Sequence, residues 1–360
     1  MKRVFISDCE GPISKNDNAY ELTSHFVPEG KKIFTIISKY DDVLADVLKR
    51  ENYKAGDTLK LILPFLKAFG ASDKKMKELS AKTLVLIPNI KITLDHIRKI
   101  AHAFIISTSY EHYIKALCGA LGFPYENTRC TRLSIDKYHF RKEEKTRLEV
   151  IAKEIAKMVN IEIPLKAQSL EDFSENGQET VKRLDGIFWK EITNMGAGRI
   201  FHEVNPIGGR EKAQSIRDIV NELDVEMKDV MYVGDSITDV EALKLVKEND
   251  GLSLSFNGNQ YAIKNAEIAA LSENSLVTAL LADVFCRAGK HETRKLVENW
   301  STEMLRKCGV NQTILDCFLS AKTRRPTKVK IITTKNMEIL SRESSTLRKK
   351  VRGEAVGGLG

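Results

Sequence analysis

The sequence predicts an α/β fold, a doubly wound parallel sheet with helices on both faces. Short apolar runs at 4–7, 103–106, 230–233 and 252–256 are typical of buried strands, and each is followed by polar or turn-forming residues. Between these runs lie helical patterns, in which apolar residues recur three and four positions apart. Strands that alternate with helices favour a parallel sheet, because each helical crossover returns the chain to the same end of the sheet.

The composition excludes several broad classes of protein. Of the 360 residues, 42% are hydrophobic and 29% are charged, a balance that argues against a largely disordered or fibrous chain. No apolar run approaches the roughly 18 residues that a membrane helix needs. The six cysteines are scattered without metal-ligand spacing, which argues against a disulfide framework and a structural zinc site. We therefore expect a soluble protein of a reducing cytoplasm, and leave its oligomeric state open.

The positive charge of the chain is concentrated in its last forty residues. The formal net charge is +8, and residues 321–360 contain eleven Lys or Arg against three Asp or Glu. We expect this tail to be a solvated, partly disordered terminus, with a short docked strand at 329–332 as the alternative. A protein partner docked through the tail is a further possibility. Nucleic-acid binding is not expected, because the tail lacks the aromatic side chains on which bases stack.

Polar side chains follow three of the predicted strands. They are Asp8 and Glu10, Ser107 and Thr108, and Asp235 and Asp239. In an open parallel sheet the carboxyl ends of the strands share one crevice, where ligands bind. Four acidic side chains in that crevice would repel one another without a cation, and Mg²⁺ suits such an oxygen-rich site. Lys212 precedes the strand at 230–233 by one helix, so it can reach the same crevice.

In order along the chain, these residues resemble the four motifs of the haloacid dehalogenase-like superfamily of phosphohydrolases. Asp-Cys-Glu-Gly at 8–11 is similar to the first motif, Asp-x-Asp-Gly, and the apolar run that ends on Ser107 is similar to the second. Lys212 is similar to the third motif, and Gly-Asp-Ser-Ile-Thr-Asp at 234–239 matches the fourth, Gly-Asp-x-x-x-Asp. The segment 252–257, an apolar strand that runs into Phe-Asn, resembles the phosphoserine phosphatase branch.

The resemblance implies a Mg²⁺-dependent phosphatase or phosphotransferase that acts on a small phosphorylated metabolite through an aspartyl-phosphate on Asp8. It implies that Glu10 is the general acid and base and that Lys212 stabilises negative charge in the transition state. Ser107 and Thr108 would bind the substrate phosphate. The metal ligands implied by the resemblance are Asp8, the backbone carbonyl of Glu10, Asp235 and Asp239, the last directly or through water.

Two positions in the first motif depart from the family pattern. Glu10 stands where these phosphatases usually carry Asp, and Pro12 stands where Thr is common. Glu is one methylene longer, and a displacement of about 1 Å can cost on the order of 100-fold in rate. The alternative function is therefore a weakly catalytic or non-catalytic accessory subunit that docks on a partner complex through its basic tail. The loop at 8–12 also resembles archaeal members of the superfamily described as subunit R of the energy-converting hydrogenase A.

The spacing of the motifs leaves two insertions that are too long to be simple connections. We expect a helical cap before the second motif and a second, α-rich insertion before Lys212. The predicted division is a catalytic core at 1–15, 95–135 and 200–290, a helical cap at 16–94, a second insertion or cap at 136–199, a C-terminal helical extension at 291–320 and the basic tail at 321–360.

Overall fold

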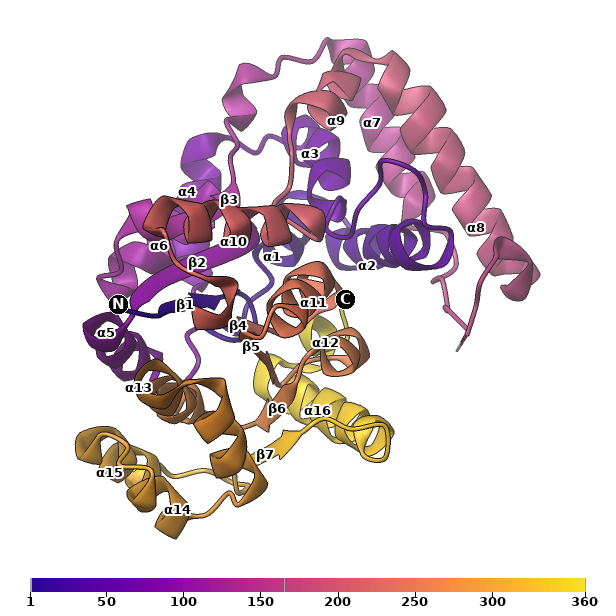
Figure 1. Ribbon diagram of the computed structural model, residues 1–360. Helices are drawn as coiled ribbons and strands as arrows, with labels where there is room; N and C mark the ends of the chain where they lie inside the picture. The colour runs from indigo at the N-terminus through magenta and orange to yellow at the C-terminus, as the bar shows by residue number, and fades with distance from the viewer. Residues whose placement is uncertain (1, 165, 360) are drawn as a thin grey trace.

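The computed structural model describes residues 2–164 and 166–359, and within them seven strands form one sheet (Figure 1). The order is β3-β2-β1-β4-β5-β6-β7, in which β1 to β6 pair in parallel and β7 pairs antiparallel with β6. The strands are β1 (Val4–Ser7), β2 (His102–Tyr110), β3 (Thr128–Thr131), β4 (Val230–Gly234), β5 (Leu252–Phe256), β6 (Ile268–Leu271) and β7 (Lys328–Ile331).

The helices lie in the connections between strands and in the C-terminal part of the chain. They are α1 (Asn18–Phe26), α2 (Gly30–Asp42), α3 (Thr58–Ala68), α4 (Asp73–Thr83), α5 (Ile90–Ile100), α6 (Glu111–Leu121), α7 (Lys142–Ile155), α8 (Glu175–Gly186), α9 (Arg199–Glu203), α10 (Arg210–Leu223), α11 (Val240–Glu248), α12 (Gln260–Asn265), α13 (Leu276–Glu298), α14 (Thr302–Lys307), α15 (Gln312–Ser320), α16 (Met337–Arg352) and α17 (Glu354–Gly357). Over the described ranges, none of these helices combines the length and the apolar character needed to cross a membrane.

The sheet buries both of its faces, as a doubly wound α/β fold requires. Because side chains alternate along a strand, Val4 and Ile6 face a core shared with α10, α11 and α12. Phe5 faces the opposite core, which α5, α6 and α13 cover. The predicted fold class is therefore confirmed. Neither β3 nor β6 was anticipated from the sequence: β3 is short and polar, and β6 contains two alanines in four residues, so neither gives a strong strand pattern.

The two insertions pack together as one helical unit above the sheet (Figure 1). Side chains from α1 to α3 and from α7 to α9 belong to a single hydrophobic cluster. At its centre Phe188 stacks on Tyr40, with ring centroids 5.8 Å apart, and meets Phe65 edge-on. The boundary expected at 94–95 falls inside α5, which packs against the sheet from Ile90 onward. The boundary expected at 290–291 follows Gly289, where α13 kinks at a φ of 83°.

The basic tail is folded, so the expectation of a partly disordered terminus is wrong. Residues Lys328–Ile331 form β7 at the edge of the sheet, close to the strand considered as the alternative. The following helix, α16, lays Leu340 and Leu347 against Ile263 and Leu271. The sequence signal was missed because the net charge of the tail masks an amphipathic helix with one narrow apolar stripe.

Candidate active site

Two strand ends bring the first and fourth motifs together at the centre of the sheet. Ser7 of β1 pairs with Val233 of β4, and the Asp8 backbone N–H donates to the Val233 carbonyl at 2.8 Å. Asp8 and Asp235 therefore follow neighbouring strands at nearly the same level. Together with Asp239 they form a buried group in which one carboxylate oxygen from each residue lies within 4.8 Å of the others.

Lys212 supplies a buried positive charge to this group. It comes from the first turn of α10, its side chain is fully buried, and its Nζ lies 2.8 Å from Oδ1 of Asp8 and 2.8 Å from Oδ1 of Asp239. Burial by itself would lower the pKa of Lys212, but the two carboxylates outweigh burial and raise that pKa above its usual value. The ammonium therefore stays charged at neutral pH and bridges the first and fourth motifs.

The environment of Asp8 weakens its ionisation in the metal-free chain. Burial raises the pKa of Asp8 to about 7, Lys212 opposes this shift, and the charges of Asp239 and Asp235 add to it. A bound cation would favour the ionised carboxylate, because an opposite charge at short range lowers the pKa of an acid. The charge state of this side chain is therefore sensitive to what binds beside it.

Asp239 acts mainly as an acceptor for groups of the protein itself. Its Oδ1 accepts from Lys212 and from the Tyr232 hydroxyl at 2.6 Å, and its Oδ2 accepts from the backbone N–H groups of Asp235 and Ser236, each at 3.0 Å. Burial opposes the charge, but Lys212 and these hydrogen bonds together hold the pKa of Asp239 below its usual value. This carboxylate fixes the loop after β4 and the position of Lys212.

The acidic group fits a hard divalent cation. Oδ1 of Asp235 is buried without a hydrogen-bond partner, and carboxylate oxygens are the ligands that Mg²⁺ prefers. Asp8 and Asp235 are the best-placed direct ligands, since both oxygens of Asp239 already accept hydrogen bonds from the protein. Gly11 allows this close approach: its φ is 109°, and a Cβ there would lie 1.9 Å from Oδ2 of Asp235.

Glu10 lies in the same crevice, with its carboxyl turned toward the start of α1. Its Oε1 accepts from the backbone N–H of Asn18 at 2.8 Å. Burial, reinforced by the charge of Asp17, raises the pKa of Glu10 well above its usual value. A carboxyl whose pKa is raised in this way is suited to general-acid catalysis.

The two hydroxyl residues predicted to bind phosphate differ in the hydrogen bonds that their side chains already make. Oγ of Ser107 accepts from the backbone N–H of Ser109 at 3.1 Å, which leaves its own O–H available to donate. The hydroxyl of Thr108 instead donates to the carbonyl of Ile207 at 3.0 Å. Both residues line the same cavity as Asp8, so Ser107 can offer its side chain to a ligand while that of Thr108 is occupied.

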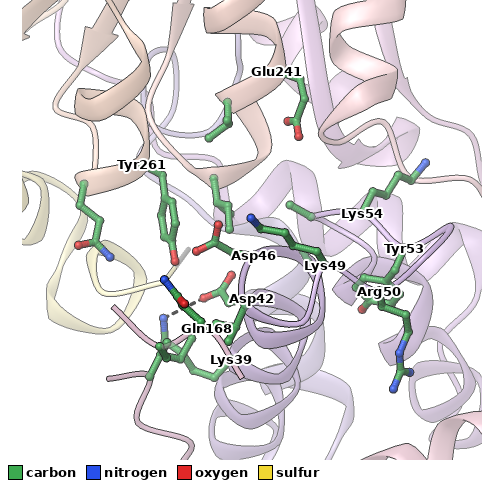
Figure 2. A pocket seen from close by; sticks show the side chains of 18 of the residues that line it. Lys39, Asp42, Asp46, Lys49, Arg50, Tyr53, Lys54, Gln168, Glu241 and Tyr261 are labelled. Carbon is green, nitrogen blue, oxygen red and sulfur yellow. Dashed lines mark hydrogen bonds and ion pairs between the residues drawn. The ribbon is translucent and has the colours of Figure 1, made fainter. Parts of the chain in front are cut away.

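Two adjoining cavities open beside these residues. The smaller, about 90 Å³, is lined by Asp8, Glu10 and Asp235 among others. The larger, about 1420 Å³, lies between the helical unit and the core, and Asp42 and Ile237 line both cavities. Figure 2 shows charged and polar side chains projecting into the larger cavity from both sides. Its walls carry eight Lys or Arg and five Asp or Glu over the described residues, so it favours a polar, charged ligand.

Two residues at the site were missed by sequence reasoning, Arg348 and Arg352 of α16. Both contact Oδ2 of Asp235, from a helix more than a hundred residues further along the chain. Their side chains are 3% and 5% exposed. The one available signal was their spacing of four residues, which places two arginines close to the face of α16 that carries Leu340, Ser344 and Leu347.

Comparisons with known proteins give a family match and structural neighbours for this chain. A family profile of haloacid dehalogenase-like hydrolases matches residues 72–280, more than half of the chain. A solved structure of a gene product from Archaeoglobus fulgidus has a TM-score of 0.77 and 23% identity, and the alignment covers 100% of this chain and 99% of that one. These two chains share a fold.

Solved structures of phosphoserine phosphatase are more distant. The apo form has a TM-score of 0.42 and 12% identity, with 76% of this chain and 96% of that chain covered. A substrate-bound phosphoserine phosphatase complex has a TM-score of 0.44 and 11% identity, with 76% and 95% covered. A comparison with curated protein sequences gives no match.

Proposed function

The chain belongs to the haloacid dehalogenase-like hydrolases, and we propose that it is a phosphohydrolase that acts on a small phosphomonoester with Asp8 as the nucleophile. The observation that carries this proposal is the contact of Lys212 with both Asp8 and Asp239 in a buried acidic group. A fixed ammonium beside a carboxylate at the carboxyl end of a parallel sheet is what phosphoryl transfer needs for positioning and charge stabilisation. The more specific resemblance to hydrogenase subunit R stays a prediction.

In the proposed reaction, an oxygen of Asp8 attacks phosphorus and the bond from phosphorus to the ester oxygen breaks. Glu10 gives its proton to the departing oxygen, so an alcohol leaves and an aspartyl-phosphate remains. Glu10, now ionised, takes a proton from water as the water attacks phosphorus. The bond between phosphorus and Asp8 then breaks, phosphate leaves, and both carboxyls return to their starting states.

The other residues hold the phosphoryl group during both steps. Lys212 offsets the negative charge that develops on the phosphoryl oxygens, and the hydroxyl of Ser107 donates to one of them. A divalent cation held by Asp8 and Asp235, with Asp239 behind them, would supply charge neutralisation between the anionic nucleophile and the anionic phosphate. The remainder of the substrate would occupy the larger cavity, whose charged walls suit a polar metabolite.

The alternative, a weakly catalytic or non-catalytic accessory subunit that docks on a partner complex through its basic tail, has less support. The face of α16 that carries Leu340, Leu347 and Arg348 packs on its own core, so it is not available to a partner. Docking of a partner through the basic tail stays a prediction, and Lys349 and Lys350 of this tail are exposed.

The test is hydrolysis of an aryl phosphate, 4-nitrophenyl phosphate, with Mg²⁺ and with excess chelator. We expect turnover that requires the cation and falls by about 10³-fold or more in Asp8→Asn. Asp250→Asn serves as the matched control, because this carboxylate is 92% exposed. Equal turnover in Asp8→Asn and the wild type would contradict the proposal, as would turnover that is unchanged by the chelator.

A further inference from the structure

Arg348 and Arg352 join the C-terminal helix to the acidic group. Nη1 of Arg348 donates to Oδ2 of Asp235 and, at 3.1 Å, to the Asp235 backbone carbonyl. Nη1 of Arg352 lies 3.1 Å from the same Oδ2. Two guanidiniums from successive turns of one helix therefore share a single carboxylate oxygen of a candidate metal ligand.

These contacts are held in place by the surrounding fold. Arg352 also donates through Nε to the carbonyl of Lys15 at 3.1 Å and through Nη2 to that of Asn16, just beyond the Glu10 loop. Ser344 of the same helix donates to the Gly258 carbonyl at 2.6 Å. The arginines are therefore part of the wall of the site and are not loose surface side chains.

One donor at this position has no hydrogen-bond partner in the protein. Nε of Arg348 is buried and has no hydrogen-bond partner, and Arg348 lines the same small cavity as Asp8. A buried donor without a partner is costly, and an anion in the cavity would relieve that cost. A guanidinium cannot lose its proton in a protein, so both charges are permanent.

The ion-paired groups of the acidic cluster contain equal numbers of positive and negative charges. When ionised, Asp8, Asp235 and Asp239 carry three negative charges, and Lys212 with the two arginines carries three positive charges. Glu10 and Asp17 also line the small cavity, and the charges of Arg348 and Arg352 act on the pKa of Asp17 as well. A divalent cation alone would add two positive charges close to three buried cations, which is unfavourable. A phosphate dianion added with the cation would offset that added charge.

We propose that Arg348 and Arg352 are positioning residues that act through Asp235, so that a divalent cation binds weakly alone and tightly together with a phosphate dianion. This inference rests on the proposed function, because it assigns the same crevice to cation and phosphate. It adds α16, outside the four motifs, to the site. It also gives the basic tail an intramolecular role in selecting cation and phosphate as a pair.

The experiment is calorimetric titration of the full chain, first with Mg²⁺ alone and then with orthophosphate at saturating Mg²⁺. In Arg348→Gln/Arg352→Gln we expect affinity for Mg²⁺ alone to rise by about tenfold or more, because two nearby positive charges are gone. We expect orthophosphate affinity to fall by about tenfold or more. Arg348→Lys/Arg352→Lys keeps the charges, so it should restore much of the phosphate affinity.

A control on the same helix separates charge at the site from charge on the tail. Lys349→Gln/Lys350→Gln removes two positive charges from exposed neighbours, and we expect both affinities to stay within about twofold of the wild type. A purely structural role of the arginines predicts instead that both affinities fall in the Gln double variant, together with faster hydrogen exchange in α16. That result, or two unchanged affinities, would overturn the inference.

The remaining outcomes separate this inference from the proposed function. If the Gln double variant does not fold, Arg352→Gln carries the test, with smaller shifts expected in the same two directions. The protein could show no hydrolysis of phosphomonoesters while the Gln double variant binds Mg²⁺ more tightly and orthophosphate more weakly. That result would support the inference and count against the proposed function. Turnover that depends on Asp8, with neither affinity changed by the arginine substitutions, would support the function and overturn the inference.

Discussion

The loop after β1 and the helix α16 both reach Asp235, but different forces hold them there. Backbone pairing of β1 with β4 places the loop, so the main chain fixes Asp8 and Gly11 largely independently of the surrounding side chains. Helix α16 depends on side-chain packing, chiefly Leu340 and Leu347 against the last strands and α12. One site therefore combines a part set by sheet register with a part set by side-chain packing.

The largest effect should come from crowding the loop. Gly11→Ala puts a Cβ 1.9 Å from Oδ2 of Asp235 at a φ of 109°, so we expect a loss of about 4 kcal/mol or more in unfolding free energy. Urea unfolding followed by circular dichroism measures it. The matched control is Gly119→Ala in α6, where a Cβ meets nothing within 4 Å, and we expect a gain of about 0.5–1 kcal/mol there. Equal changes in unfolding free energy in the two variants would show that the loop tolerates a Cβ as well as α6 does.

Removing the buried ammonium should be the next most damaging change. Lys212→Met leaves Asp8 and Asp239 without their cation, and we expect a loss of about 3–5 kcal/mol in unfolding free energy at pH 8. Lys228→Met removes an exposed ion pair with Glu226, and should change stability by less than about 1 kcal/mol. The same urea titrations compare them. A small effect at Lys212 would mean that the acidic group is neutral or well hydrated in the metal-free protein.

The attachment of α16 can be weakened without touching the site. Leu340→Ala removes a side chain that is 1% exposed from the contact with Ile263 and Leu271, at a cost of about 2–4 kcal/mol. We expect hydrogen exchange to accelerate over α16 and to change little in β1. Ile339→Ala, on the same helix but 52% exposed, should cost less than about 0.5 kcal/mol. Exchange that accelerates equally in β1 and α16 would show that the two parts unfold as one.

The smallest expected effect is on the pH dependence of stability. Burial raises the pKa of Asp8 and of Asp41 to about 7 in the folded, metal-free chain, against about 3.9 when unfolded. The unfolded state therefore releases these protons at lower pH, and stability should fall as pH rises from 6.5 to 7.5, by on the order of 1–2 kcal/mol for the two groups together. Unfolding in the presence of chelator measures the slope.

A variant at Asp41, in the helical unit, separates the contribution of that residue to the pH dependence of stability from that of Asp8. The Asp41 carboxyl accepts from the Tyr53 hydroxyl at 2.7 Å and from the Gly56 backbone at 2.9 Å, and it lines the same small cavity as Asp8. Asp41→Asn should flatten the slope, and Asp250→Asn, at an exposed position, should leave it unchanged. A slope that is the same in all three proteins would rule out Asp41 as a contributor.

Local patterns were enough to predict the core of this protein. The strands at β1, β2, β4 and β5 were expected from apolar runs, and polar residues after them were expected to meet at one edge. That expectation follows from the parallel sheet, because the topology alone brings Asp8, Ser107 and Asp235 to a common crevice. By contrast, β3 and β6 were missed, since a short edge strand or an alanine-rich strand gains its stability from its neighbours.

The sequence by itself determined the fold class, the order of the motifs and the residues at the ends of the central strands, because strand periodicity and sheet topology act over short stretches of chain. Only the tertiary structure decided that the two insertions share one core and that the basic tail folds back on the site. It alone placed Arg348 and Arg352 on Asp235, more than a hundred residues away in sequence. Such contacts depend on how α16 packs against elements that are distant in sequence. The composition of the tail shows only that it is basic.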